Sequence, residues 1–262
     1  MDFLNIKDKT FLITGASNKK SIATFIAHTL LRQGARPVFL VQSEAHMQRM
    51  ERIFPDSPFY ICDVENEKAF NYFSEKIMAD NHVLSGMIHA IAFANYQTPV
   101  PFMKTRTDDF LQAFNISCLS FIRLCNLPRA VFTDNASMVT FSISTTKSAA
   151  YGYLGPVKAA LESTVAYLAQ SFAKSSQIRV NAICAGPLKT AAAAGIPGFM
   201  NNYLYSEKLS LRKSALQTQE VANTAAFLLS ERSSGINATN VLVDAGMSVN
   251  TFDEQIVRSC LD

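Results

Sequence analysis

The chain has 262 residues, of which 48% are hydrophobic and 17% are charged, so it can build a large globular core and does not have the composition of a disordered protein. Lysine and arginine number 24 against 21 acidic residues, which argues against nucleic-acid or membrane-surface binding. Five scattered cysteines without a C-x-x-C pair predict buried, reduced thiols, and neither they nor the four histidines have metal-site spacing. No segment resembles a secretory signal or a membrane span, which favours a soluble cytoplasmic protein.

Short β-rich apolar runs alternate with longer segments of helical periodicity along the chain. The expected strands are 10–14, 37–41, 59–62, 87–91, 136–141, 179–184 and 240–243. The expected helices are 21–33, 44–54, 66–80, 107–126, 151–174 and 218–231. This alternation is typical of a parallel sheet buried on both faces, and no linker or repeat divides the chain. We therefore predict an α/β fold with one doubly wound Rossmann domain over residues 1–262 and a sheet of about seven strands.

One segment, residues 190–215, interrupts the alternation. It is a long insertion between a strand and the last long helix. It falls at the edge of the sheet where ligands bind in doubly wound folds. We interpret it as a substrate-binding lid.

The turn after the first strand is the first sign of a nucleotide site. Gly15 allows a sharp turn under a pyrophosphate, and the N–H groups of the helix that opens at Ser21 and Ile22 favour a negative charge. Only Gly15 remains of the usual G-x-G-x-x-G motif. An ordinary strand–turn–helix with Ser21 as its N-cap therefore explains the same residues.

Further signals follow the next three strands. Gln42 can bond a ribose hydroxyl but offers no charge to a 2′-phosphate, which favours NADH over NADPH. Asp63 and Val64 follow the third strand, although an aspartate there is also a common helix N-cap. Around Ile91 and Ala92, small residues let a flat cofactor approach the main chain. Together these positions predict a dinucleotide site along the ends of the strands.

Tyr151 and Lys158 carry the clearest chemical signal. If one helix holds both, a spacing of seven places them on one face, two turns apart, whereas Tyr153 faces elsewhere. A lysine beside a phenol favours hydrogen-bond donation by the phenol, and its ammonium group can grip ribose hydroxyls. The alternative is an exposed lysine with a tyrosine packed on the sheet.

Over about residues 1–250 the chain resembles the enoyl-acyl-carrier-protein reductases of the short-chain dehydrogenase/reductase superfamily. The motifs are TG-x5-SIA at 14–23, Gln42, CDV at 62–64, HAIAFA at 89–94, Tyr151-x6-Lys158, RVNAICAGPLKT at 179–190 and VDAG at 243–246. The six-residue gap between Tyr151 and Lys158 is specific, because most of the superfamily has a three-residue gap and here position 154 is a leucine.

The resemblance implies an NADH-dependent reduction of the trans-2 double bond of an enoyl thioester in fatty-acid biosynthesis. Tyr151 is then expected to hydrogen-bond the enolate oxygen, and Lys158 to hold the nicotinamide ribose. The expected cofactor-binding residues are Gly15, Ser21, Ile22, Gln42, Asp63, Val64, Ile91, Ala92, Lys158, Gly186, Pro187, Leu188 and Thr190. The expected partners are acyl-carrier protein or another acyl thioester carrier, and further copies of the chain in a homotetramer.

Two positions depart from the family pattern. The family's second tyrosine is replaced by Phe141 or Ile143, depending on the alignment, so a hydroxyl would have to come from Ser142, Ser144, Thr145 or Thr146. The part of the lid that follows AAGI, residues 197–202, lacks the family's basic residues, although Lys208, Arg212 and Lys213 come later in the lid. The alternatives are therefore a reductase of the same fold with a substrate that is not carrier-bound, and a non-catalytic dinucleotide-binding paralogue.

Overall fold

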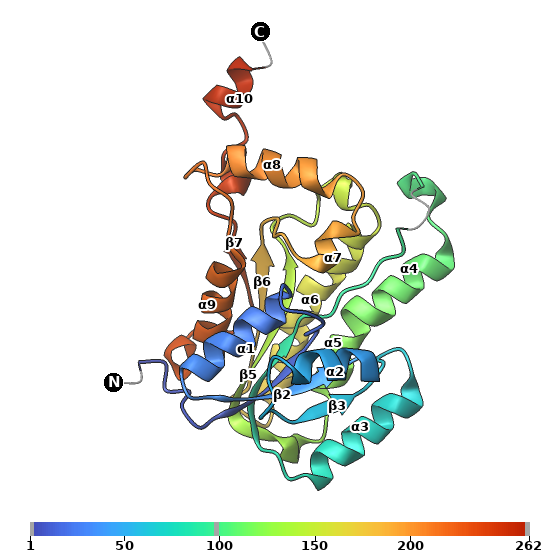
Figure 1. The fold of residues 1–262 in the computed structure, drawn as a ribbon, viewed down its shortest axis with the longest axis vertical. Helices are drawn as coiled ribbons and strands as arrows, with labels where there is room; N and C mark the ends of the chain where they lie inside the picture. Colours follow the sequence, from blue (N-terminus) through green and yellow to red (C-terminus); the bar gives the residue numbers. More distant parts are fainter. Residues whose placement is uncertain (1–2, 97–99, 260–262) are drawn as a thin grey trace.

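A parallel sheet of seven strands forms the centre of the computed structural model, which describes residues 3–96 and 100–259 (Figure 1). The strand order is β3-β2-β1-β4-β5-β6-β7, so the direction of winding reverses between β1 and β4. The strands are β1 (Thr10–Thr14), β2 (Arg36–Val41), β3 (Phe59–Ile61), β4 (Leu84–His89), β5 (Phe132–Ile143), β6 (Arg179–Ala185) and β7 (Thr239–Val243). The predicted doubly wound sheet is confirmed.

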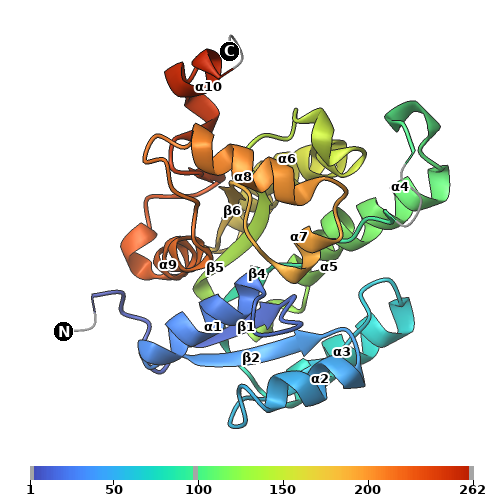
Figure 2. The ribbon, with the colours of Figure 1, turned by 45° about the horizontal axis from the view of Figure 1, so that its top comes forward.

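Helices cover both faces of this sheet (Figure 2). One face packs against α1 (Ile22–Arg32), α2 (Glu44–Glu51) and α9 (Thr218–Leu229). The other face packs against α3 (Glu67–Ala79), α4 (Thr107–Phe114), α5 (Ser120–Cys125) and α6 (Leu154–Ala173). Strand side chains alternate between two apolar cores: Leu12 of β1 enters one, and its neighbours Phe11 and Ile13 enter the other. This double burial explains why the strands are almost wholly apolar.

The predicted element boundaries are wrong at several places, and β5, for example, spans Phe132–Ile143 instead of 136–141. Strand β4 spans Leu84–His89 instead of 87–91, so Ile91 lies in the loop beyond it. The predicted helix 107–126 is α4 and α5 joined by a π-helical turn at Asn115–Leu119. The predicted helix 151–174 is α6, which begins only at Leu154.

Residues 190–215 follow β6 and contain two helices, α7 (Ala191–Ala194) and α8 (Phe199–Leu209), which lie at the upper end of β6 in Figure 1. A short C-terminal helix, α10 (Glu254–Arg258), was not predicted. None of the helices in the described parts of the chain is long and apolar enough to span a membrane. Cys62, Cys118, Cys125 and Cys184 are buried free thiols, as predicted, whereas Cys260 lies outside the described residues.

Candidate active site

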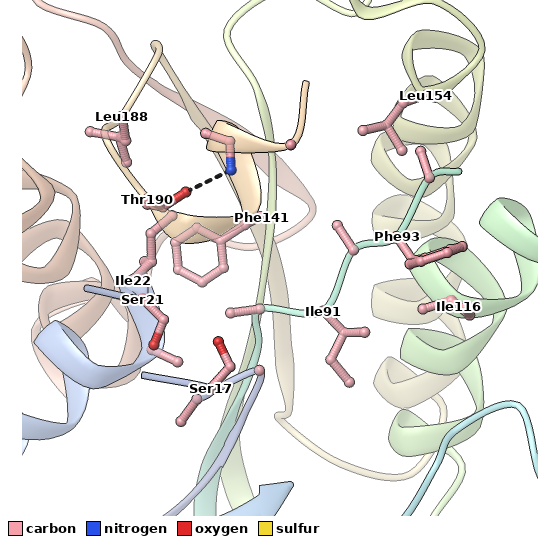
Figure 3. Close-up of a pocket in the computed structure, with 18 of the residues that line it drawn as sticks. Ser17, Ser21, Ile22, Ile91, Phe93, Ile116, Phe141, Leu154, Leu188 and Thr190 are labelled. Carbon is pink, nitrogen blue, oxygen red and sulfur yellow. Dashed lines mark hydrogen bonds between the residues drawn. The ribbon is translucent and has the colours of Figure 1, made fainter. Parts of the chain in front are cut away.

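A cavity of about 680 Å³ opens at the carboxyl ends of the strands. The residues predicted for catalysis and cofactor binding all line it: Gly15, Ser21, Ile22, Gln42, Asp63, Val64, Ile91, Ala92, Tyr151, Lys158, Gly186, Pro187, Leu188 and Thr190. Figure 3 shows Ile22, Leu188 and Thr190 on one side and Leu154 and Ile116 on the other, with the ring of Phe141 between them. The topology therefore gathers residues from six successive segments of the chain into one site.

Gly15 shapes the floor of the cavity at the end of β1. Its φ is +81°, a conformation that glycine adopts without strain, and a Cβ there would lie 2.1 Å from the carbonyl oxygen of Ala90. The main chain of the β1–α1 turn is thus packed directly against the segment after β4. The hydroxyl of Ser21 donates to the carbonyl of Asn18 at 3.0 Å instead of capping α1. Ser21 therefore occupies the predicted N-cap position without capping the helix through its side chain, and this end of α1 lines the cavity.

Gln42 and Asp63 meet at the rim, where β2 and β3 end. The Gln42 amide approaches the Asp63 carboxylate at 3.5 Å, and that carboxylate also accepts the N–H of Glu65 at 3.1 Å. The cap of α3 is Asn66, whose side chain accepts from the N–H of Ala69, so the alternative role of Asp63 as a helix N-cap is wrong. An amide and a carboxylate side by side can bind the two hydroxyls of a ribose.

Among the described residues of α2, Arg49 is the only arginine or lysine side chain that forms a hydrogen bond at this rim. Its Nη1 donates to the carbonyl of Ser17 at 3.1 Å, and Ser17 lines the cavity. His46, one turn earlier on α2, also lines the cavity, and its Nδ1 lies 2.9 Å from the hydroxyl of Ser43. Neither residue was predicted from the sequence, because both lie inside a helix and have no motif of their own.

Lys158 is buried in α6, with 5% of its surface exposed, so the alternative of a solvated lysine is wrong. Its Nζ donates to the carbonyl of Phe141 at 2.8 Å. Burial lowers the pKa of Lys158 to about 8, while Cys118, Glu162 and Cys184 act in the opposite direction. The ammonium form therefore still predominates near neutral pH, although burial works against it.

Glu162, one turn after Lys158, holds the same end of β5 to α6. Its carboxylate accepts a hydrogen bond from the hydroxyl of Ser142 and another from the thiol of Cys184 at 3.6 Å. Lys158 and Glu162 thus bind the adjacent residues Phe141 and Ser142. Because these two bonds come from successive turns of one helix, they fix the position of α6 relative to the end of β5. Glu162 was not singled out from the sequence.

Tyr151 does not lie on α6, so the prediction of a shared helix for Tyr151 and Lys158 is wrong. It ends a short 3-10 helix, Ala149–Tyr151, and Gly152 follows with a φ of +54°. Pro156 explains the break, since a proline inside a helix removes a hydrogen bond and clashes with the preceding turn, but it is tolerated in the first turn. Both side chains nevertheless line the same cavity, and burial raises the pKa of Tyr151, so its phenol stays protonated.

The positions expected for a second tyrosine, Phe141 and Ile143, both line the cavity, and neither carries a hydroxyl. Ser142 also reaches it, but its hydroxyl is bonded to Glu162. The lining does include a second phenol: Tyr96, from the segment after β4. Its spacing from the other motifs gave no reason to expect it there.

His89, at the end of β4, is a buried structural residue. Its Nδ1 lies 2.8 Å from the hydroxyl of Thr140, and its Nε2 lies 2.8 Å from the hydroxyl of Ser120. Because Ser120 gives its one proton to the carbonyl of Ile116, Nε2 must be the donor to Ser120. Burial, together with Lys158, lowers the pKa of His89 well below its ordinary value, so a neutral ring joins β4, β5 and α5. Groups of side chains that could hold a metal ion are absent from the described residues.

Two of the basic residues in the later part of the lid are paired within the molecule. Arg212 forms a two-point ion pair with Glu220 at 2.5 and 2.6 Å. Lys213 is paired with Asp253 and also donates to the carbonyl of Lys208 at 2.9 Å. Lys208, Arg212 and Lys213 are the three basic residues that the sequence offers for docking an acidic carrier, and two of them therefore already have carboxylate partners.

The comparisons with known proteins agree with this geometry. Residues 15–248 match the family model described as Enoyl-(Acyl carrier protein) reductase. The enoyl-[acyl-carrier-protein] reductase [NADPH] FabI of Staphylococcus aureus is 35% identical over 252 residues, covering 93% of this chain and 98% of that protein. The enoyl-[acyl-carrier-protein] reductase [NADH] FabI of Bacillus subtilis is 34% identical over 255 residues, covering 94% of this chain and 98% of its relative.

Solved structures give the same result. The crystal structure of the enoyl-[acyl-carrier-protein] reductase (NADH) of Aquifex aeolicus is similar with a TM-score of 0.88 and 31% identity, over 93% of this chain and 98% of that one. The Bacillus cereus enoyl-acyl carrier protein reductase, crystallised with NADP+ and indole naphthyridinone, has the same TM-score, identity and coverage. The family match, the full-length relatives and the shared fold establish that the chain belongs to the enoyl-acyl-carrier-protein reductase family.

Proposed function

We propose that this protein reduces the trans-2 double bond of an enoyl thioester in fatty-acid biosynthesis, with NADH as the preferred reductant. The observation that carries the proposal is that Tyr151 and Lys158 line one cavity with all the residues expected to hold the dinucleotide. The Gly15 turn supports it, because it packs against Ala90 and leads to the start of α1, which lines the cavity and whose free N–H groups favour the charge of a pyrophosphate.

In this proposal each group of cavity residues binds one part of the cofactor or the substrate. A bound nicotinamide cofactor supplies the hydride. Lys158 binds the ribose hydroxyls on the nicotinamide side, and Gly186, Pro187, Leu188 and Thr190 border the ring and the pyrophosphate. Gln42 and Asp63 bind the ribose at the other end. Tyr151 donates a hydrogen bond to the thioester oxygen, where negative charge develops as the β-carbon receives the hydride.

The preference for NADH rests on Gln42, which has no charge to offer a 2′-phosphate. Arg49 acts against this preference, since it is a cation held at the same rim through Ser17. The two family members named above for S. aureus and B. subtilis differ in just this respect, one being an NADPH form and the other an NADH form. The ratio of kcat/KM for the two cofactors is therefore the direct measurement.

Residues 190–215 act as the substrate-binding lid of a single catalytic domain spanning 1–262. The support is that Thr190, Gly195, Ile196 and Phe199 line the cavity from this segment, and that the hydroxyl of Thr190 accepts the N–H of Ala193 at 3.2 Å (Figure 3). We further propose a cytoplasmic homotetramer. Apolar side chains exposed on the elements expected at the subunit contacts, such as Leu242 of β7 and Tyr167 of α6, support this assembly.

The carrier is acyl-carrier protein in this proposal, and one observation favours a second candidate. Helix α8 exposes Met200, Asn201 and Leu204, and Arg212 and Lys213 are paired internally. Such a surface offers fewer free cations for docking an acidic carrier protein, which favours a thioester that needs no carrier docking, such as a coenzyme A ester.

The test is NADH oxidation with one enoyl acid presented as its carrier-protein and as its coenzyme A thioester. We expect turnover of the carrier form, and a loss of about 10²-fold or more in kcat for Tyr151→Phe, which removes one oxyanion donor. Higher kcat/KM for the coenzyme A ester supports the second candidate. Tight NADH binding without turnover of either ester contradicts both and indicates a non-catalytic paralogue.

A further inference from the structure

The main chain of Tyr151 is not fixed by α6. Its N–H donates to the carbonyl of Ser148 at 3.1 Å, within the short 3-10 turn, and the left-handed Gly152 separates it from the first turn of α6. The carbonyl of Tyr151 accepts a hydrogen bond from the hydroxyl of Tyr96 at 3.0 Å. The position of Tyr151 therefore depends on a contact from the segment after β4.

Tyr96 is itself held firmly next to this turn. Its ring lies 5.9 Å from the ring of Tyr153, and the hydroxyl of Tyr153 accepts the N–H of Asn95 at 2.6 Å and donates to the carbonyl of Asn95 at 3.0 Å. The Asn95 side chain donates to Asp109 of α4 at 3.0 Å. Three hydrogen bonds and a ring contact thus join residues 95–96 to residues 151–153, and α4 anchors the pair.

The hydroxyl of Tyr96 is a reliable donor. Burial, with Tyr153 and Tyr151 nearby, raises the pKa of Tyr96 to about 12, so the phenol keeps its proton at any pH where the enzyme is folded and working. Its ring lines the cavity beside Tyr151, whereas the positions at the end of β5 hold Phe141 and Ile143. The second phenol of this cavity therefore comes from the segment after β4.

We propose that Tyr96 is a positioning residue: through the carbonyl of Tyr151 it fixes the turn that aims the Tyr151 phenol at the thioester oxygen. This inference rests on the proposed function, because it assigns Tyr96 a role in the step that Tyr151 performs. A misplaced phenol weakens the hydrogen bond to the thioester oxygen more in the transition state than in the bound substrate, because the negative charge on that oxygen develops only in the transition state.

The test is Tyr96→Phe, which keeps the ring and removes the donor. We expect kcat to fall about five- to tenfold, the effect of one hydrogen bond, while KM for the nicotinamide cofactor stays within about twofold. In a Tyr151→Phe background, Tyr96→Phe should cause no further loss, because its effect passes through the Tyr151 phenol. The matched control is Tyr60→Phe, which removes a phenol bonded to Asp80 at 2.6 Å, at the far end of α3. This control should leave kcat unchanged.

An unchanged kcat in Tyr96→Phe overturns the inference while leaving the proposed function intact. An equal fold-loss in the Tyr151→Phe background also overturns it, since the residue then acts independently of Tyr151. A wild-type enzyme that turns over no enoyl thioester refutes the proposed function itself, and the role of Tyr96 with it.

Discussion

Replacing Lys158 with methionine should make the protein more stable and inactive at once. Burial lowers the pKa of Lys158 from 10.5 to about 8, which corresponds to about 3 kcal/mol of stability lost at pH 7, where the buried side chain is charged. Methionine has a similar length and carries no charge. The variant also loses the bond from Nζ to the carbonyl of Phe141, and that loss costs about 1 to 2 kcal/mol. We therefore expect Lys158→Met to gain about 1 to 2 kcal/mol.

The pH dependence gives a second, independent check. Between pH 8 and 10.5 the unfolded chain binds a proton at Lys158 that the folded chain has released, so wild-type stability rises with pH in this window. At pH 10 the stability difference should have moved by about 2 to 3 kcal/mol in favour of the wild type, so the advantage of the variant should be gone.

Urea unfolding of the cofactor-free protein at pH 7 and pH 10, at one protein concentration, measures both effects. Lys68→Met, at an exposed position on α3, is the control and should change stability by less than about 0.5 kcal/mol. A Lys158→Met variant that is less stable than wild type at pH 7, or whose advantage does not shrink at pH 10, refutes the reasoning.

Three further predictions follow from the same geometry. The kcat/KM of the wild type should fall about tenfold per pH unit above pH 8, as Lys158 loses its proton and its charge no longer holds the ribose; a flat profile up to pH 9.5 contradicts this. Arg49→Gln should leave kcat/KM for NADH within about twofold and lower it at least about tenfold for NADPH, if Arg49 offers charge to a 2′-phosphate; equal losses with both cofactors would sink that role. Gly15→Ala should lower the free energy of unfolding by at least about 2 kcal/mol, because Gly15 has a positive φ and an added Cβ would lie 2.1 Å from the carbonyl oxygen of Ala90. Thermal denaturation measures this loss, and a melting temperature equal to that of the wild type would contradict the prediction.

The sequence predicts the sheet well, because its strands are buried on both faces and appear as short apolar runs. Elements with weaker periodicity were placed less accurately. Strand β4 begins at Leu84, although the apolar run becomes continuous only at Met87. The start of α6 was misplaced because helical spacing was counted through Gly152 and Pro156, two residues that together mark a helix start.

The site residues that came from motifs all reached the cavity, since motifs at the ends of parallel strands meet at one edge. The residues that were missed act through tertiary contacts. Tyr96, Glu162 and Arg49 have no motif, and their partners are 55, 20 and 32 residues away in sequence. Only the folded structure brings such pairs together.

The pairing of Lys213 with Asp253 affects how the protein can be produced and studied. Asp253 also accepts the side chain of Asn250 at 2.9 Å, and Asn250 donates to the carbonyl of Leu209, the last residue of α8, at 2.7 Å. The segment that leads into α10 is therefore hydrogen-bonded to the end of α8, whose first residue, Phe199, lines the cavity. We expect a purification tag fused after α10 to act on these bonds, whereas a tag fused ahead of β1 is remote from them, because β1 begins at the edge of the sheet opposite the carboxyl ends of the strands.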